Sequence, residues 1–249
     1  METLYRSALL VHVLAGTVGL LAMVPPLLAR KGARIHRCSG FLFAGAMTLV
    51  VITGLVLASH WLLMPALFRT GASPSAVRLD AVFLSAIAAL TGNAVLQAIR
   101  AIRRKRQPAP GRSPLLLGSL MVLALSGLLS LGMGLMEQHV LSTVFGAGCL
   151  VVAVRDARFT LRPLASRHAY LYQHIQAMGT ACISAVTAFL VLGGQRFFQV
   201  DTFGTGSLVM WFLPGAIGGP LFQLWILHYK RKLEGPRTAP AKASVHASA

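Results

Sequence analysis

Seven apolar stretches, each about twenty residues long, dominate this sequence of 249 residues. An α-helix rises about 1.5 Å per residue, so a helix of this length crosses the hydrocarbon core of a bilayer. Apolar residues make up 55% of the chain and charged residues only 12%. The sequence therefore predicts an all-α, polytopic membrane helix bundle with spans near residues 7–29, 38–59, 79–99, 114–136, 140–155, 171–193 and 207–228.

Basic residues are distributed unevenly between the connecting segments. Nineteen of the 23 Lys and Arg residues follow spans one, three, five and seven. Because cytoplasmic loops carry the excess of Lys and Arg, we expect the N-terminus outside and the C-terminus in the cytoplasm. This distribution explains the net charge of +17 without a nucleic-acid-binding face. The bias toward Arg over Lys, with many Ala, Gly and Leu residues, favours a bacterial inner (plasma) membrane.

The chain is expected to form one membrane domain, residues 1–229, and a tail, residues 230–249. The tail is rich in Ala, Pro and Ser and contains several basic residues, so we expect it to be disordered and cytoplasmic. Cys38, Cys149 and Cys182 are single and lie in or beside apolar stretches, which predicts neither a disulfide framework nor a metal site. Membrane lipid is the expected partner, while a small-molecule ligand or a partner subunit remains open.

Polar side chains inside the apolar stretches need partners, because a polar group in the bilayer core is costly. Asn93 and Gln97 are four residues apart and share one face of the third span. Counting residues places His174 and Gln176 of the sixth span and Gln223 of the seventh at a similar depth, in the cytoplasmic half. We expect Asn93, Gln97, His174 and Gln223 to form one polar cluster. Either this cluster holds a ligand, or it only joins helices through hydrogen bonds of about 0.6–2 kcal/mol each.

The first span contains His12 and, four residues later on the same face, Gly16. Either a neighbouring helix or the flat edge of a cofactor fills the notch beside this glycine. We expect the helix, with His12 pointing into the bundle and bonding to another span or to a water. The last span carries WFLPGAIGGP at 211–220, whose prolines and glycines predict a kink or local unwinding.

A b-type haem is the alternative use of the histidines, with His12 and His174 as the candidate cofactor-binding residues. Bis-histidine ligation needs two imidazoles at the same depth on facing helices. The candidate pairs are His12 with His60 or His139 on the outer side, and His174 with His36 or His228 on the inner side.

The sequence resembles an uncharacterised family of bacterial predicted membrane proteins, a domain of unknown function. The resemblance is carried by His12 and Gly16, by the basic segment His36, Arg37 and Gly40 that opens the second span, and by Arg167 and His168 before AVTAFLV at 185–191. WFLPGAIGGP is similar to the last span of that family. The resemblance implies a fold and a membrane location but no activity.

Two functional interpretations follow. The first is a non-enzymatic membrane protein, either a small transporter, a lipid-binding protein or a subunit of a complex, with the inner polar cluster as its site. The second is a membrane electron-transfer protein that binds haem b. An enzyme is the least favoured class, because no carboxylate pair or activated nucleophile is evident at membrane depth.

Overall fold

The structure is a computed structural model that describes residues 2–65, 73–107, 109–110, 113–194, 202–203 and 205–234. Within these residues, seven helices are long and apolar enough to cross a membrane, which confirms the all-α, seven-span prediction. They are α1 (Glu2–Leu28), α2 (Arg34–Leu63), α3 (Pro74–Arg103), α4 (Pro114–Met136), α5 (Val140–Leu161), α6 (Ala169–Ala188) and α8 (Leu208–Glu234). Helix α6 continues into a π-helical turn, η2 (Phe189–Gly193), and a 3₁₀ turn, η3 (Thr205–Ser207), precedes α8.

Three of the sequence-based expectations need correction. Helix α5 does not end at residue 155 but continues to Leu161, because the charges at its end are paired inside the bundle instead of lying in a loop. Helix α8 continues to Glu234, so residues 230–234 are helical and do not belong to a disordered tail; the rest of the tail lies outside the described residues. Of the kink or local unwinding expected in this helix, the unwinding does not occur, because α8 runs through both Pro214 and Pro220. Each proline removes one backbone donor, and the remaining ladder keeps the helix intact in an apolar environment.

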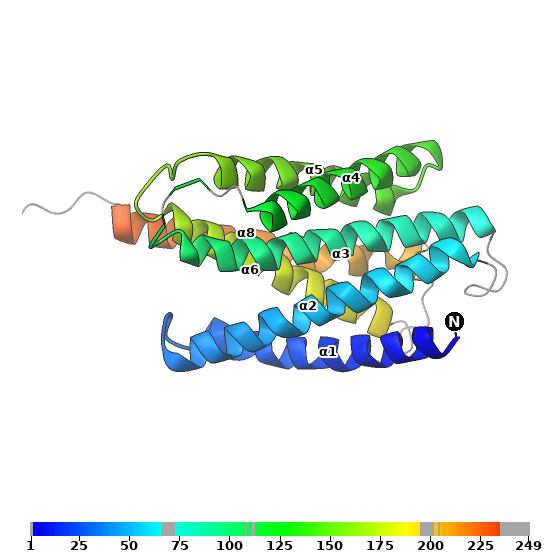
Figure 1. Cartoon of the computed structure of the whole chain (residues 1–249), viewed down its shortest axis with the longest axis horizontal. Helices are drawn as coiled ribbons and strands as arrows, with labels where there is room; N and C mark the ends of the chain where they lie inside the picture. The colour runs from blue at the N-terminus through cyan, green and yellow to red at the C-terminus, as the bar shows by residue number, and fades with distance from the viewer. Residues whose placement is uncertain are drawn as a thin grey trace, which may run out of the picture.

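Helix α3 occupies the centre of the bundle (Figure 1). It packs against α2 on one side, against α4 and α5 on another, and against α6. Helix α8 packs mainly on α6. Helix α1 packs mainly on α2. The connections after α1, α3 and α5 lie at the same end of the bundle as the C-terminal end of α8 (Figure 1). We call this the basic end, because the Lys- and Arg-rich segments gather there.

Helices α4 and α5 form the tight hairpin that their three-residue connection predicts. In this connection Gln138 adopts φ of 52°, and the His139 N–H donates to the Gly134 carbonyl oxygen at 2.8 Å, closing the end of α4. A Cβ atom on Gly134 would lie 2.5 Å from the backbone nitrogen of Thr143, and one on Gly146 would lie 2.5 Å from that of Leu131. The two backbones thus touch at positions where only glycine fits.

One apolar cluster joins helices α1, α2, α3 and α6, and a few partly buried side chains pack around it. Phe43 of α2 and Ala181 of α6 are both fully buried in it. This cluster fixes the relative rotation of the four helices, and so determines which faces of α2 and α6 point inward near the basic end. Its buried members are Ala22, Phe43, Ala44, Met47, Ala94, Val95, Ala181, Cys182 and Ala185.

Candidate functional site

A buried carboxylate, Asp156 of α5, is the centre of the polar network. Its side chain is 0% exposed. Asn93 Nδ2 of α3 donates to Asp156 Oδ2 at 2.7 Å, and Gln173 Nε2 of α6 donates to Oδ1 at 2.9 Å. Arg155 Nε also donates to Oδ1 at 2.9 Å and supplies the compensating charge. Ser119 of α4 extends the network by donating to Asn93 Oδ1 at 3.2 Å. Four helices are therefore tied together at the level of this carboxylate.

Helices α3 and α5 run in the same direction, and their polar contacts repeat along the interface. One turn beyond the Asn93–Asp156 pair, Gln97 Nε2 donates to Thr160 Oγ1 at 3.1 Å. Further toward the end of α3, the buried Arg104 guanidinium donates to the carbonyl oxygens of Phe159 and of Arg162, the latter at 3.0 Å. A cation at a helix C-terminus satisfies carbonyls that have no partner within the helix. This stacked arrangement fixes the register of α3 against α5.

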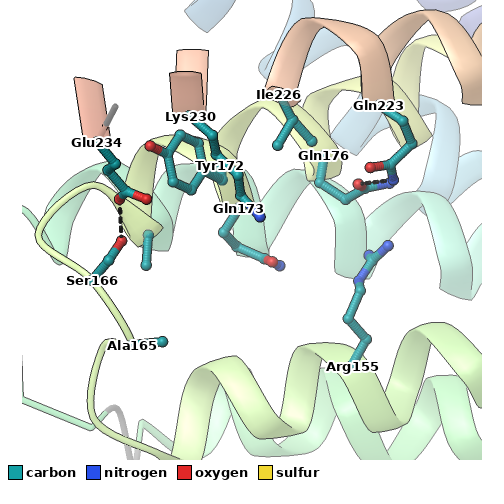
Figure 2. A pocket seen from close by; sticks show the side chains of 11 residues that line it. Arg155, Ala165, Ser166, Tyr172, Gln173, Gln176, Gln223, Ile226, Lys230 and Glu234 are labelled. Carbon is teal, nitrogen blue, oxygen red and sulfur yellow. Dashed lines mark hydrogen bonds between the residues drawn. The ribbon is translucent and has the colours of Figure 1, made fainter. Parts of the chain in front are cut away.

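An open pocket of about 430 Å³ lies beside the network, between α5, α6 and α8 at the basic end (Figure 2). Across it, Gln223 Nε2 of α8 donates to Gln176 Oε1 of α6 at 2.6 Å. The Lys230 ammonium lies 5.4 Å from the centre of the Tyr172 ring. The pocket is lined by Arg155, Ala165, Ser166, Ala169, Tyr172, Gln173, Gln176, Gln223, Ile226, Lys230 and Glu234.

Arg155 belongs to both the network and the pocket. Its Nε is bonded to the buried Asp156, whereas its side chain is 34% exposed. Figure 2 shows the guanidinium rising from α5 across the pocket toward the Gln176–Gln223 pair. Among the described residues, no acceptor bonds to either Nη atom, so both keep donors that can reach a bound molecule. On the far side of the pocket, Glu234 accepts from the Ser166 hydroxyl at 2.6 Å.

The structure distributes the four residues of the expected polar cluster over neighbouring positions. Asn93 and Gln97 face α5, where each has a partner. His174 lies on the other side of α3, with Nδ1 3.0 Å from the Ala98 carbonyl oxygen. Gln223 is bonded to Gln176 at the pocket and is exposed. The four side chains therefore do not form one cluster, because α8 packs mainly on α6 and meets α3 at the other end, where Trp211 contacts Phe83.

His12 points toward α2, as expected from the sequence. Its Nδ1 lies 2.9 Å from the Thr53 hydroxyl oxygen, and a Cβ on Gly54 would lie 3.4 Å from its Cε1. Val50 of α2 is the closest side chain to the Cβ position of Gly16, at 3.9 Å. A neighbouring helix thus fills the notch beside His12.

The outer haem pairs are not brought together. His60 packs against Tyr5, which lies seven residues before His12, so the two histidines differ in depth by about 10 Å. His139 caps α5, and its Nδ1 accepts from the Ser142 N–H at 3.3 Å. On the inner side, His228 is exposed and packs against Tyr229. His36 is the other inner candidate for pairing with His174.

The sequence-based reasoning assigned Asp156 to a cytoplasmic loop and missed its role, together with those of Arg155 and Gln173. A signal was present: Asp156 and Thr160 are four residues apart, as are Asn93 and Gln97. Two such pairs on parallel helices predict two successive cross-helix hydrogen bonds. This signal could be interpreted only once α3 and α5 were known to be neighbours.

The fold and this site define a seven-span helical membrane protein with a buried polar network. No family model matches the chain, and no significantly similar curated protein or solved structure was found.

Proposed function

We propose that this protein is a non-enzymatic protein of the bacterial inner membrane that binds an anionic amphiphile, such as a phospholipid with a net negative headgroup, in the pocket at the basic end. The observation that carries the proposal is the position of Arg155. Its Nε is held by Asp156 while its Nη donors face the pocket. A guanidinium fixed in this way is well suited to a phosphate or carboxylate, which it binds through two parallel hydrogen bonds.

Most of the remaining lining of the pocket fits the same ligand; the exception is the Glu234 carboxylate, which accepts from the Ser166 hydroxyl on the far side. Lys230 provides a second cation, and the side-chain amides of Gln173 and Gln223 provide polar contacts for a headgroup. Ile226 and Ala169 add apolar surface for the adjoining glycerol and acyl carbons. Basic pockets between spanning helices near a membrane face are a known way of recognising anionic headgroups.

Lipid binding explains more of these features than the two other non-enzymatic roles, a small transporter and a subunit of a complex. A transporter usually binds its substrate near the midplane of the membrane, whereas this pocket lies at the basic end. A purely structural subunit requires no pocket. With the N-terminus outside and the basic end in the cytoplasm, the pocket faces the cytoplasmic leaflet. The proposal includes membership in the uncharacterised family that the sequence resembles. That membership implies no activity.

Native mass spectrometry of the detergent-purified protein with phosphatidylglycerol and phosphatidylcholine tests this function. We expect phosphatidylglycerol to bind more tightly, and Lys230→Gln to weaken its binding about fivefold, since one basic residue near a membrane surface contributes about 1 kcal/mol. Arg231→Gln is the matched control, because it removes the same charge from the next, exposed position. Equal binding of the two lipids, or an equal effect of Arg231→Gln, contradicts the proposal.

Arg155 is tested without leaving Asp156 as an unpaired buried charge. The double variant Arg155→Gln/Asp156→Asn removes both charges and keeps side chains that hydrogen bond. We expect it to lose the preference for phosphatidylglycerol over phosphatidylcholine. A retained preference shows that Arg155 does not bind the headgroup.

A further inference from the structure

His36 and His174 lie at the same level of the basic end. His36 precedes Phe43 by seven residues on α2, and His174 precedes Ala181 by seven residues on α6. Seven residues are almost two full turns, so each histidine shares a helix face with its cluster residue, about 10 Å nearer the basic end. Since Phe43 and Ala181 belong to the same buried cluster, the faces that carry the two histidines turn toward the same core.

Both imidazoles are held in the same way. His36 Nδ1 lies 3.0 Å from the Pro26 carbonyl oxygen of α1, and His174 Nδ1 lies 3.0 Å from the Ala98 carbonyl oxygen of α3. A carbonyl oxygen only accepts hydrogen bonds, so each Nδ1 carries the proton and each Nε2 keeps its lone pair. No described residue bonds to either Nε2. This arrangement is the one that orients histidines bound to metals, whose other nitrogen donates to a carbonyl or carboxylate.

The two rings are also close enough to interact electrostatically. Both are partly buried, so neither is a freely rotating surface side chain. We propose that His36 and His174 together bind a transition-metal centre through their Nε2 atoms, between α2 and α6 at the basic end.

The chemistry of the donors limits the metal. Neutral imidazole suits zinc, copper, iron and nickel, and disfavours magnesium and calcium. Within the part of the chain that the structure describes, no group of three or more His, Cys, Asp or Glu residues could hold a metal ion, so the protein supplies two ligands here. Water completes the coordination of a free ion, and porphyrin nitrogens complete that of haem iron. A free ion and a haem iron would therefore have the same two imidazole ligands at this site.

This site is independent of the lipid pocket, because neither histidine lines that pocket. The test uses the full-length protein purified in detergent. Free-ion binding is measured by titration with Co²⁺, whose visible absorption reports imidazole ligation, and with Zn²⁺ in competition. Haem binding is measured by the Soret absorption of the protein as isolated and after addition of hemin.

The informative variants are His36→Asn and His174→Asn. The Asn side-chain amide can keep the hydrogen bond to Pro26 or Ala98 and lacks the second ring nitrogen, so the fold is preserved while the ligand is lost. His228→Asn is the control, since it removes an exposed histidine from the same end. Loss of an outer-shell partner typically weakens metal binding about 10–100-fold, so loss of a ligand should weaken it by at least about 100-fold.

We expect the wild type to bind one equivalent of Co²⁺ or of hemin, and to unfold at a higher temperature when loaded. Each of the two Asn variants should lose both the binding and the thermal shift, while His228→Asn keeps them. A cobalt spectrum without a Soret band identifies a free ion, and a Soret band identifies haem. Failure of the wild type to bind either probe, or unchanged binding in a folded His36→Asn/His174→Asn double variant, overturns the proposal. If an Asn variant does not fold, His36→Gln and His174→Gln replace it, and unchanged binding in either folded Gln variant overturns the proposal.

Discussion

Asp156 illustrates how a charged side chain is accommodated inside this bundle. Removing a carboxylate from water costs several kcal/mol unless charges and donors replace the solvent. Here one guanidinium and two side-chain amides replace it. The neutral Gln97–Thr160 contact one turn away faces no such cost, because either partner can be removed without exposing a charge. The two contacts therefore differ in energy although they have the same spacing.

Replacing Asn93 with Leu should destabilise the protein by about 2 kcal/mol, because the charged Asp156 loses a donor. Replacing Thr160 with Val should cost only about 0.6 kcal/mol, the average for a neutral hydrogen bond between spanning helices. Unfolding midpoints measured in the same detergent test this order. A larger loss for Thr160→Val contradicts the view that Asp156 is the centre of the network.

His12 presents the opposite case of a polar residue whose loss is tolerated. Its partner, the Thr53 hydroxyl, also donates to the Leu49 carbonyl oxygen at 2.7 Å and keeps that bond without the imidazole. His12→Leu should therefore remain folded, with a loss near 0.6 kcal/mol. His12→Ala should lose about 2 kcal/mol through the space it opens beside Gly54. Thermal unfolding of the two variants is the measurement, and equal destabilisation contradicts this account.

At the scale of elements, the α4–α5 hairpin depends on direct backbone contact. Gly127, Gly134 and Gly146 bring the two helices together, and a Cβ on any of them would meet backbone atoms of the other helix. Backbone atoms cannot move aside as a side chain can. The hairpin is therefore a rigid unit, which presents the Asp156 face of α5 to α3.

Gly146→Ala should destabilise the protein by about 1–3 kcal/mol, the usual cost of overpacking. Gly148→Ala is the matched control on the same helix, since nothing lies within 4 Å of its Cβ position. The control should be neutral or slightly stabilising, because Ala favours helix over Gly. Unfolding midpoints distinguish the two variants, and similar values would show that the helices separate easily.

At the scale of the whole molecule, the ends of the bundle differ strongly in charge. The described Lys and Arg residues are concentrated at the basic end, while Arg6 and Arg78 lie near the N-terminal ends of α1 and α3. This asymmetry is the kind that sets membrane orientation during insertion. The proposed headgroup pocket and the proposed histidine site both lie at the basic end, so the orientation decides which compartment each one faces.

Reporter fusions after Arg106 and after Lys232 should read cytoplasmic, and fusions near Ser73 and Asp201 should read external. Alkaline phosphatase and a fluorescent protein serve as the paired reporters, because each is active on only one side of a bacterial inner membrane. A uniformly reversed pattern shows the opposite orientation. A single loop on the wrong side shows that one of the seven helices does not span the membrane.

The number, type and approximate limits of the helices could be predicted from the sequence, because length and apolar composition are local properties that the bilayer selects directly. The same holds for the partner of His12, since a neighbouring helix is the default solution for an imidazole beside a glycine. The predicted end of α5 was wrong, because the local sequence does not distinguish charges in a loop from charges that are paired within the bundle, as those of Arg155 and Asp156 are.

The sequence by itself thus determined the seven-helix membrane fold and the charge difference between its ends. Only the tertiary structure decided which helices are neighbours, and with them the site. Asp156 lies in the bundle because α3 and α6 bring Asn93 and Gln173 to it. Gln223 lies apart from Asn93 because at this level α8 packs on α6, where Gln223 bonds to Gln176. The physical reason is that a charge within a span is stable only when distant segments supply its partners, and those partners are not recorded in the local pattern of the chain.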